Sequence, residues 1–319
     1  MSFFKKGRLV LMAGLVTTAL IAAQPAAASL FDRLFGNKNY TKTKYPIVLV
    51  HGFSGFDQLF GVVDYFYRVP EALSKDGAKV FVAQVSAANS TEVRGEQLLA
   101  QIEEIVAVTG AKKVNIIGHS HGSPTARYVA GVRPDLVASV SSVGGANWGS
   151  EVADVVGMMD QVSDGAVQLI GNAFFKFLDV ISTGGLPQDV DASVRSLTVA
   201  GSVAFNREFP DGVPSTRCGN DGAHEANGIR YYSWGGNALR TNIFDPSDVI
   251  LSITSLAFSD ANDGLASTCS QKLGKIISLD HNHNHLDQMN HVLGLKSRNA
   301  ADPVDLYRQQ ANRLKNVGL

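Results

Sequence analysis

The 319-residue sequence has little net charge, only two cysteines and no block of basic residues. A formal net charge of −1 at pH 7 argues against nucleic acid as a partner, because nucleic-acid-binding surfaces are strongly basic. After the N-terminal segment, no stretch reaches the roughly 18 consecutive apolar residues of a membrane-spanning helix. Repeats, low-complexity tracts and linkers are missing too. We therefore expect one soluble globular domain.

Residues 1–28 have the pattern of a secretory signal peptide. Residues 1–8 are basic, residues 9–23 are apolar, and three alanines at 26–28 provide a small-residue cleavage site. A transmembrane anchor is the alternative, but the apolar run is short and rich in alanine. We expect the mature domain to span residues 29–319 and to be exported.

Cys218 and Cys269 both lie in the part of the chain that would be exported. An even number of cysteines in an oxidising compartment favours one disulfide bond. The bond would close a loop of about 50 residues and stabilise the fold by about 4 kcal/mol in the chain-entropy description. Two unpaired buried thiols are the alternative, because the sequence holds no information on their geometry.

Strands and helices are predicted to alternate along the first half of the chain. Short runs of apolar residues predict strands at 45–50, 80–85, 114–117 and 137–143. Residues 92–108 have the 3.6-residue apolar period of a helix, with Thr91 as its N-cap and Gly110 at its end. This alternation predicts a mostly parallel sheet with helices on both faces, and ligands bind such sheets at the carboxyl ends of the strands.

The predicted strand at 114–117 runs directly into Gly118-His119-Ser120-His121-Gly122. A G-x-S-x-G sequence after a strand is typical of a nucleophile elbow, in which two glycines permit a tight turn and the serine backbone is strained. Residues 124–130 predict the helix that follows, with proline in its first turn. The motif arises by chance in glycine-rich chains, so the flanking strand and helix support the interpretation. Ser120 is the predicted nucleophile of an α/β-hydrolase fold.

A serine nucleophile needs a base, and the base needs an orienting carboxylate. In this fold the chain order is serine, acid, histidine. His281, His283 and His285 follow an apolar run at 276–279, where a last strand would deliver the base. The spacing does not choose among them, and alternate histidines also suit a metal such as zinc. Asp263 is the candidate acid, although an aspartate before glycine is often a simple turn residue.

Acyl transfer also needs N–H donors for the oxyanion. In this fold one donor is the residue after the nucleophile, here His121. The second comes from the loop after an early strand, and Phe53 in the segment His51-Gly52-Phe53 is our candidate. A plain turn from strand to loop is the alternative interpretation of that segment.

Residues 166–182 depart from the α/β rhythm, because apolar residues occupy almost every side of the predicted helix. Such a helix is either buried in the core or covers something apolar. In the second case, residues around 150–185 would form a mobile lid over a lipid-binding cleft. The candidate hinges are Gly165, Gly171, Gly184 and Gly185.

The chain resembles the true lipases of Pseudomonas and Burkholderia, the bacterial lipase family I. The segments that carry the resemblance are 45–57 (YPIVLVHGFSGFD), 90–106, 114–134, 231–234, 241–248 (TNIFDPSD), 261–269 (ANDGLASTC) and 284–295 (NHLDQMNHVLGL). The resemblance implies a secreted triacylglycerol lipase with the triad Ser120, Asp263 and His285, which selects one of the three histidines. It places the oxyanion donors on Phe53 and His121. The family has methionine where Phe53 stands, a change that leaves the backbone donor in place.

The resemblance also implies one structural calcium ion. Its carboxylate ligands fall on Asp245 and Asp287, and its backbone carbonyl ligands on His291 and Leu295. The family commonly has glutamine at the position of His291, which does not affect a carbonyl ligand. Without the resemblance, Asp245 is only a turn aspartate.

The cysteine pair matches the foldase-dependent subgroup of these lipases. That match implies a lipase-specific foldase chaperone and export through the periplasm by a type II secretion machinery. Two other functions stay open from the sequence. One is a carboxylesterase or polyester depolymerase with the same triad, and the other is a non-catalytic lipid-binding protein on a hydrolase scaffold.

Overall fold

The computed structural model describes residues 38–53, 58–59, 63–159, 161–181 and 186–319. The predicted signal peptide and two of the predicted hinges, Gly184 and Gly185, lie outside these ranges. Within them, no helix has the length and apolar character needed to cross a membrane.

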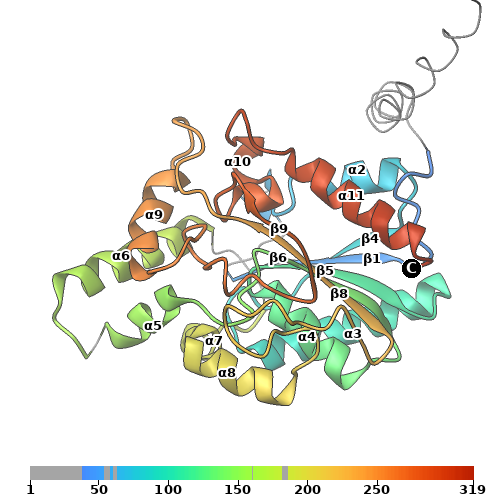
Figure 1. The fold of residues 1–319 in the computed structure, drawn as a ribbon, viewed down its shortest axis with the longest axis horizontal. Helices are drawn as coiled ribbons and strands as arrows, with labels where there is room; N and C mark the ends of the chain where they lie inside the picture. The colour runs from blue at the N-terminus through green and yellow to red at the C-terminus, as the bar shows by residue number, and fades with distance from the viewer. Residues whose placement is uncertain (1–37, 54–57, 60–62, 160, 182–185) are drawn as a thin grey trace, which may run out of the picture.

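A mostly parallel sheet runs through the centre of the molecule (Figure 1). Its strands follow the order β4 (Val80–Ala83), β1 (Ile47–Val50), β5 (Val114–His119), β6 (Val137–Val143), β8 (Ile229–Gly236) and β9 (Lys275–His281). The short strand β7 (Glu225–Ala226) pairs antiparallel with β8, and β2 (Gln58–Leu59) pairs with β3 (Val63–Asp64) in a separate ribbon. Strands β5 and β6 are buried along their whole length, as expected for central parallel strands. The predicted α/β-hydrolase architecture is confirmed.

Two layers of helices cover the sheet, because successive side chains of each strand point to opposite faces. Helices α2 (Val69–Lys75) and α11 (Pro303–Asn316) pack together on one face, and α3 (Thr91–Thr109) and α4 (Gly122–Val132) pack together on the other (Figure 1). The side chains of strand β1 alternate between these two faces. Ile47 belongs to the core beneath α2 and α11, whereas Val48 belongs to the core beneath α3 and α4.

The predicted N-cap of α3 is wrong by one residue. The Ser90 hydroxyl accepts the backbone N–H of Val93 and caps the helix. Thr91 is instead the first helical residue, and its hydroxyl is hydrogen-bonded to Nε2 of His121 at 2.9 Å. Gly110 ends the helix in the left-handed conformation with φ 67°, as predicted.

The remaining helices surround the left half of the sheet in Figure 1. They are α5 (Glu151–Met158), α6 (Gly165–Ile181), α7 (Val190–Leu197), α8 (Val199–Glu208), α9 (Ser247–Thr254), the 3-10 turns η1 (Ser255–Ala257) and η2 (Asp287–Met289), and α10 (His291–Gly294). Helix α6 buries Ile170 and Phe174 but exposes Leu169 and Phe175. It is therefore not a fully buried core helix. Gly171 gives room to the neighbouring segment, because a Cβ there would lie 1.8 Å from the sulfur of Met159.

Candidate active site

The backbone of Ser120 is strained in the way that the G-x-S-x-G motif predicts. Its φ of 54° lies in the left-handed region, which a residue with a side chain rarely adopts. The glycines on either side are required for space. A Cβ at Gly118 would lie 2.2 Å from the carbonyl oxygen of Gly122, and a Cβ at Gly122 would lie 2.3 Å from that of Val50. The turn thus carries Ser120 at the carboxyl end of β5.

Asp263 and His285 meet in the interior near the elbow. The Nδ1 atom of His285 donates to Oδ2 of Asp263 at 2.8 Å, and both side chains are buried. Two backbone N–H groups of the same turn donate to the other oxygen, Oδ1. Because Nδ1 carries the proton, the Nε2 atom of His285 has the lone pair that a general base needs.

Two glutamines that no sequence motif singles out also hold the Asp263 carboxylate. The Nε2 atoms of Gln288 and Gln271 donate to Oδ2 at 2.7 and 3.2 Å. Gln271 also donates to the carbonyl oxygens of Gly236 and Ala266. These hydrogen bonds replace the water that a buried carboxylate loses, so the charge needs no cation beside it.

Ser120 and His285 line one cavity at the carboxyl ends of the strands. Most of its other walls are apolar side chains, which include Phe53, Val152, Phe174, Leu265, Leu286 and Met289. The rings of Phe53 and Phe174 lie 5.5 Å apart, so the residue that replaces the family methionine contacts α6. A cavity of this kind suits an apolar acyl chain.

The two other candidate histidines lie elsewhere. His283 is hydrogen-bonded through Nε2 to the carbonyl oxygen of Ala301 at 2.8 Å, and His281 ends strand β9. Neither lines the cavity that contains Ser120. Among the described residues, they form no cluster with a third potential metal ligand, so the zinc alternative has no support here.

The two residues predicted to supply the oxyanion donors both lie near the serine, since His121 directly follows it in the chain. Phe53 lines the cavity with Ser120. The ring of His121 is directed into the interior, where its nitrogens contact the hydroxyls of Thr91 at 2.9 Å and Ser193 at 3.4 Å. The side chain of His121 is thus occupied, and only its backbone N–H, at the N-terminus of α4, is suited to an anion.

Arg94 fixes the loop that leads to Phe53. Its guanidinium is fully buried and donates to the carbonyl oxygens of His51 at 2.7 Å and Gly52 at 3.3 Å. Burial lowers the pKa of Arg94 to about 9. These two hydrogen bonds hold the peptide groups of the segment His51-Gly52-Phe53 in one orientation. A plain turn from strand to loop would not need a buried cation to hold it.

A chain of hydrogen bonds links this loop to the elbow and to His285. The N–H of Gly52 donates to the hydroxyl of Tyr65 at 2.9 Å, and that hydroxyl lies 2.7 Å from Nδ1 of His119. Nε2 of His119 lies 3.0 Å from the carbonyl oxygen of His285. Because a carbonyl can only accept, Nε2 carries the proton and Tyr65 donates to Nδ1. Burial lowers the pKa of His119 well below its ordinary value, which keeps the ring neutral.

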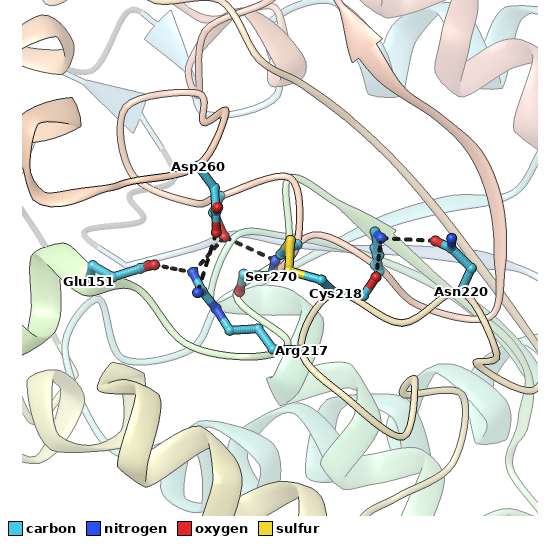
Figure 2. The surroundings of a disulfide bond; sticks show 9 residues. Glu151, Arg217, Cys218, Asn220, Asp260 and Ser270 are labelled. Atoms are coloured by element: carbon cyan, nitrogen blue, oxygen red, sulfur yellow. Dashed lines mark hydrogen bonds and ion pairs between the residues drawn. A yellow bond between two sulfur atoms is a disulfide. The ribbon is translucent and has the colours of Figure 1, made fainter.

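The disulfide bond between Cys218 and Cys269 is present, with the sulfurs 2.04 Å apart, so the prediction of a bridge is confirmed (Figure 2). Arg217 forms ion pairs with Glu151, at the start of α5, and with Asp260 (Figure 2). The disulfide and Arg217 therefore connect the N-terminus of α5 to the loop that carries the candidate acid, Asp263.

Within the part of the chain that the structure describes, potential metal ligands come together near the disulfide and around Asp245 and Asp287. Near the disulfide, ligand atoms of Cys218, Cys269 and Asp260 lie within 4.8 Å of one another, but both sulfurs are bonded to each other. At the second place, Oδ2 of Asp245 and Oδ1 of Asp287 are buried without a hydrogen-bond partner. Burial raises the pKa of Asp287 to about 7, and the charges of neighbouring aspartates add to this effect. Orphaned carboxylate oxygens among like charges fit a hard divalent cation.

The chain belongs to the α/β-hydrolase fold family, whose sequence profile matches residues 45–271. Within this family it belongs with the bacterial triacylglycerol lipases. It is 56% identical to a triacylglycerol lipase of Vibrio cholerae over 290 residues, which is 88% of this chain and 91% of that protein. It is 38% identical to a triacylglycerol lipase of Burkholderia plantarii over 338 residues, with 94% and 92% of the two chains covered. The crystal structure of Staphylococcus hyicus lipase shares the fold, with a TM-score of 0.59, 16% identity, and 86% and 96% coverage.

Proposed function

We infer that the protein is a triacylglycerol lipase that acts through a serine acyl-enzyme. One observation carries the proposal. A buried Asp263–His285 pair lies at the same apolar cavity as a strained elbow serine, Ser120, in a chain 56% identical to a triacylglycerol lipase. Its substrate is an acylglycerol ester at a lipid–water interface.

In this mechanism, the Ser120 hydroxyl attacks the ester carbonyl while Nε2 of His285 takes its proton. Asp263 keeps the ring in the required tautomer and stabilises the imidazolium that forms. The backbone N–H groups of Phe53 and His121 donate to the oxyanion. His285 then gives its proton to the leaving alcohol, and water releases the fatty acid by the same steps.

We further propose that residues 1–28 are a signal peptide, that residues 29–319 form the catalytic domain and that residues around 150–185 act as a lid. Helix α6 supports the last point, because Phe174 faces the cavity while Phe175 is exposed on the outside. A cover with apolar side chains on both faces can close over the cavity in water and open against lipid.

The disulfide supports a further proposal on folding and export. Cys218 and Cys269 form this bond, and the pair is the feature in which the sequence resembles the foldase-dependent lipases. On this basis, the protein would be folded in the periplasm with a lipase-specific chaperone and released from the cell by a type II machinery.

Substrate choice tests the proposed function. We expect rapid hydrolysis of emulsified triolein and slower hydrolysis of soluble p-nitrophenyl butyrate at the same enzyme concentration. A fluorophosphonate probe should label one residue, Ser120, identified by mass spectrometry. Activity on the soluble ester alone would make the protein a carboxylesterase or polyester depolymerase. Failure of both substrates and of the probe would leave a non-catalytic lipid-binding protein.

We propose that Asp245, Asp287 and the backbone carbonyls of His291 and Leu295 hold a calcium ion. Two observations support this proposal. One carboxylate oxygen of Asp245 and one of Asp287 are buried without a hydrogen-bond partner, and the backbone around α10 is in the left-handed conformation. When bound, the ion would supply a structural cross-link between two loops. One of those loops carries His285, two residues before Asp287.

Calcium removal is expected to lower the melting temperature by about 5 °C, since a ligand at 100 times its Kd stabilises the folded state by about 2.7 kcal/mol. Differential scanning fluorimetry with EGTA and with added CaCl2 measures this shift. Asp245→Asn should melt at the lower temperature and no longer respond to calcium. The exposed Asp191→Asn is the matched control. Identical melting curves and full activity in EGTA and in CaCl2 would refute the site.

A further inference from the structure

Among the described residues, six large apolar side chains are at least 63% exposed, and all but Val108 lie between residues 243 and 293. These five are Ile243, Phe244, Val249, Leu256 and Leu293, with exposed fractions of 94%, 75%, 63%, 65% and 63%. They come from the loop before α9, from α9 and η1, and from α10, in the upper left part of the molecule in Figure 1. We call these five residues the apolar rim.

The loop that carries the two most exposed residues is held in one conformation. The backbone N–H groups of Thr241 and Asn242 donate to Oδ2 of Asp248 at 2.8 and 2.9 Å. The Asn242 side chain accepts the N–H of Phe244 and donates to the carbonyl oxygen of Lys296. A surface that covers this loop therefore orders little chain on binding, which favours tight association.

The inner side of α9 connects the rim to the cavity. A Cβ at Gly264 would lie 2.7 Å from Cβ of Leu251, and the Thr254 hydroxyl donates to the Gly264 carbonyl oxygen at 2.7 Å. The next residue, Leu265, lines the cavity. A surface that touches the rim is thus separated from the cavity wall by little more than one helix.

The acidic side chains next to the rim are turned inward. The carboxylates of Asp245 and Asp248 are buried. Basic side chains lie beside the rim and not within it: Arg240 is exposed and hydrogen-bonded to Ser252, and Lys296, whose carbonyl oxygen accepts from Asn242, is partly exposed. Because the five side chains of the rim are themselves all apolar and uncharged, the rim matches a neutral acylglycerol surface.

We propose that the apolar rim is a fixed docking surface that adsorbs the enzyme to a neutral lipid–water interface. It belongs to α9 and its flanking loops, not to the segment around 150–185, so it presents its apolar side chains whether or not that segment moves. This inference rests on the proposed lipase function, since an acylglycerol substrate is itself the interface. The rim would bring the cavity to the lipid before any ester is bound.

Adsorption to a triolein emulsion tests the rim. The measurement uses Ser120→Ala protein, so that no lipid is consumed. Adding Ile243→Ser and Phe244→Ser is expected to weaken adsorption at least tenfold, because two large apolar side chains no longer leave water. The matched control adds Val108→Ser and Val132→Ser, exposed valines on α3 and α4, and should adsorb normally. In the Ser120 background, the rim changes should leave hydrolysis of soluble p-nitrophenyl butyrate unchanged.

A tryptophan reporter keeps the test independent of the double variant. The chain has two tryptophans, so Phe244→Trp adds a third whose emission should shift to shorter wavelength on addition of triolein. Val108→Trp should show no shift, and anionic phosphatidylglycerol vesicles should produce little shift at Phe244→Trp.

Unchanged adsorption of the double variant, or no shift at Phe244→Trp, would overturn the proposal. If the double variant adsorbed normally but no longer self-associated, the proposal would also be overturned, and the rim would be an interface between two copies of the chain. These outcomes differ from failure of the lipase proposal, in which Ser120 protein adsorbs to triolein but does not hydrolyse it.

Discussion

Ser120→Ala is expected to lower kcat for ester hydrolysis by about 10⁶-fold, which is the typical effect of removing the nucleophile of a serine hydrolase. The alanine has no oxygen to form the acyl-enzyme, and the remaining turnover would come from binding and the oxyanion donors. Both triolein release and p-nitrophenyl butyrate hydrolysis should fall together. Titrimetry on the emulsion and absorbance on the soluble ester measure the two rates.

The fold should survive this substitution, because alanine keeps the Cβ and meets the same backbone strain at φ 54°. A melting temperature within about 2 °C of the wild type, on the usual relation between stability and melting, is the control. Gly118→Ala should behave differently and fail to fold, since its Cβ would lie 2.2 Å from a backbone oxygen. Activity above 1% of wild type in purified Ser120→Ala protein would place the nucleophile elsewhere.

The features predicted correctly from the sequence are those that depend on neighbours along the chain. The elbow is an example. The strand before Ser120, the two glycines and the helix after it follow one another along the chain, so the local sequence is enough to predict the elbow. The end of α3 at Gly110 is local in the same sense. The predicted start of α3 is one residue late, because Ser90 and Thr91 are both good caps. The choice between them depends on His121, which lies 30 residues away.

The contacts that hold the site cannot be predicted from the sequence, because they join residues far apart in the chain. Arg94 reaches the carbonyl oxygen of His51 across 43 residues, and His119 reaches that of His285 across 166. No spacing rule covers such pairs. The choice of His285 among three alternate histidines came from the resemblance alone. In the structure, the hydrogen bond to Asp263 distinguishes it from the other two.

Asp263→Asn is expected to lower kcat by about 10⁴-fold, and the surrounding donors determine the direction in which the amide must lie. Two backbone N–H groups, those of Leu265 and Ala266, point at Oδ1 and cannot rotate. The amide oxygen must therefore take the Oδ1 position, which puts the NH2 group at the position of Oδ2. There it faces Nδ1 of His285 and the amide of Gln288, both of which are donors in the wild type.

The conflict between donors is resolved when His285 moves its proton to Nε2, and the ring then has no lone pair for the proton of Ser120. Kinetics on p-nitrophenyl butyrate measure the loss, and the signal of the Nδ1 proton in the ¹H NMR spectrum should disappear. Asp260→Asn, in the same loop, is the matched control and should retain activity within about tenfold, because its partner is the partly exposed Arg217. An Asp263→Asn enzyme with more than a tenth of wild-type kcat would show that the carboxylate does not set the tautomer.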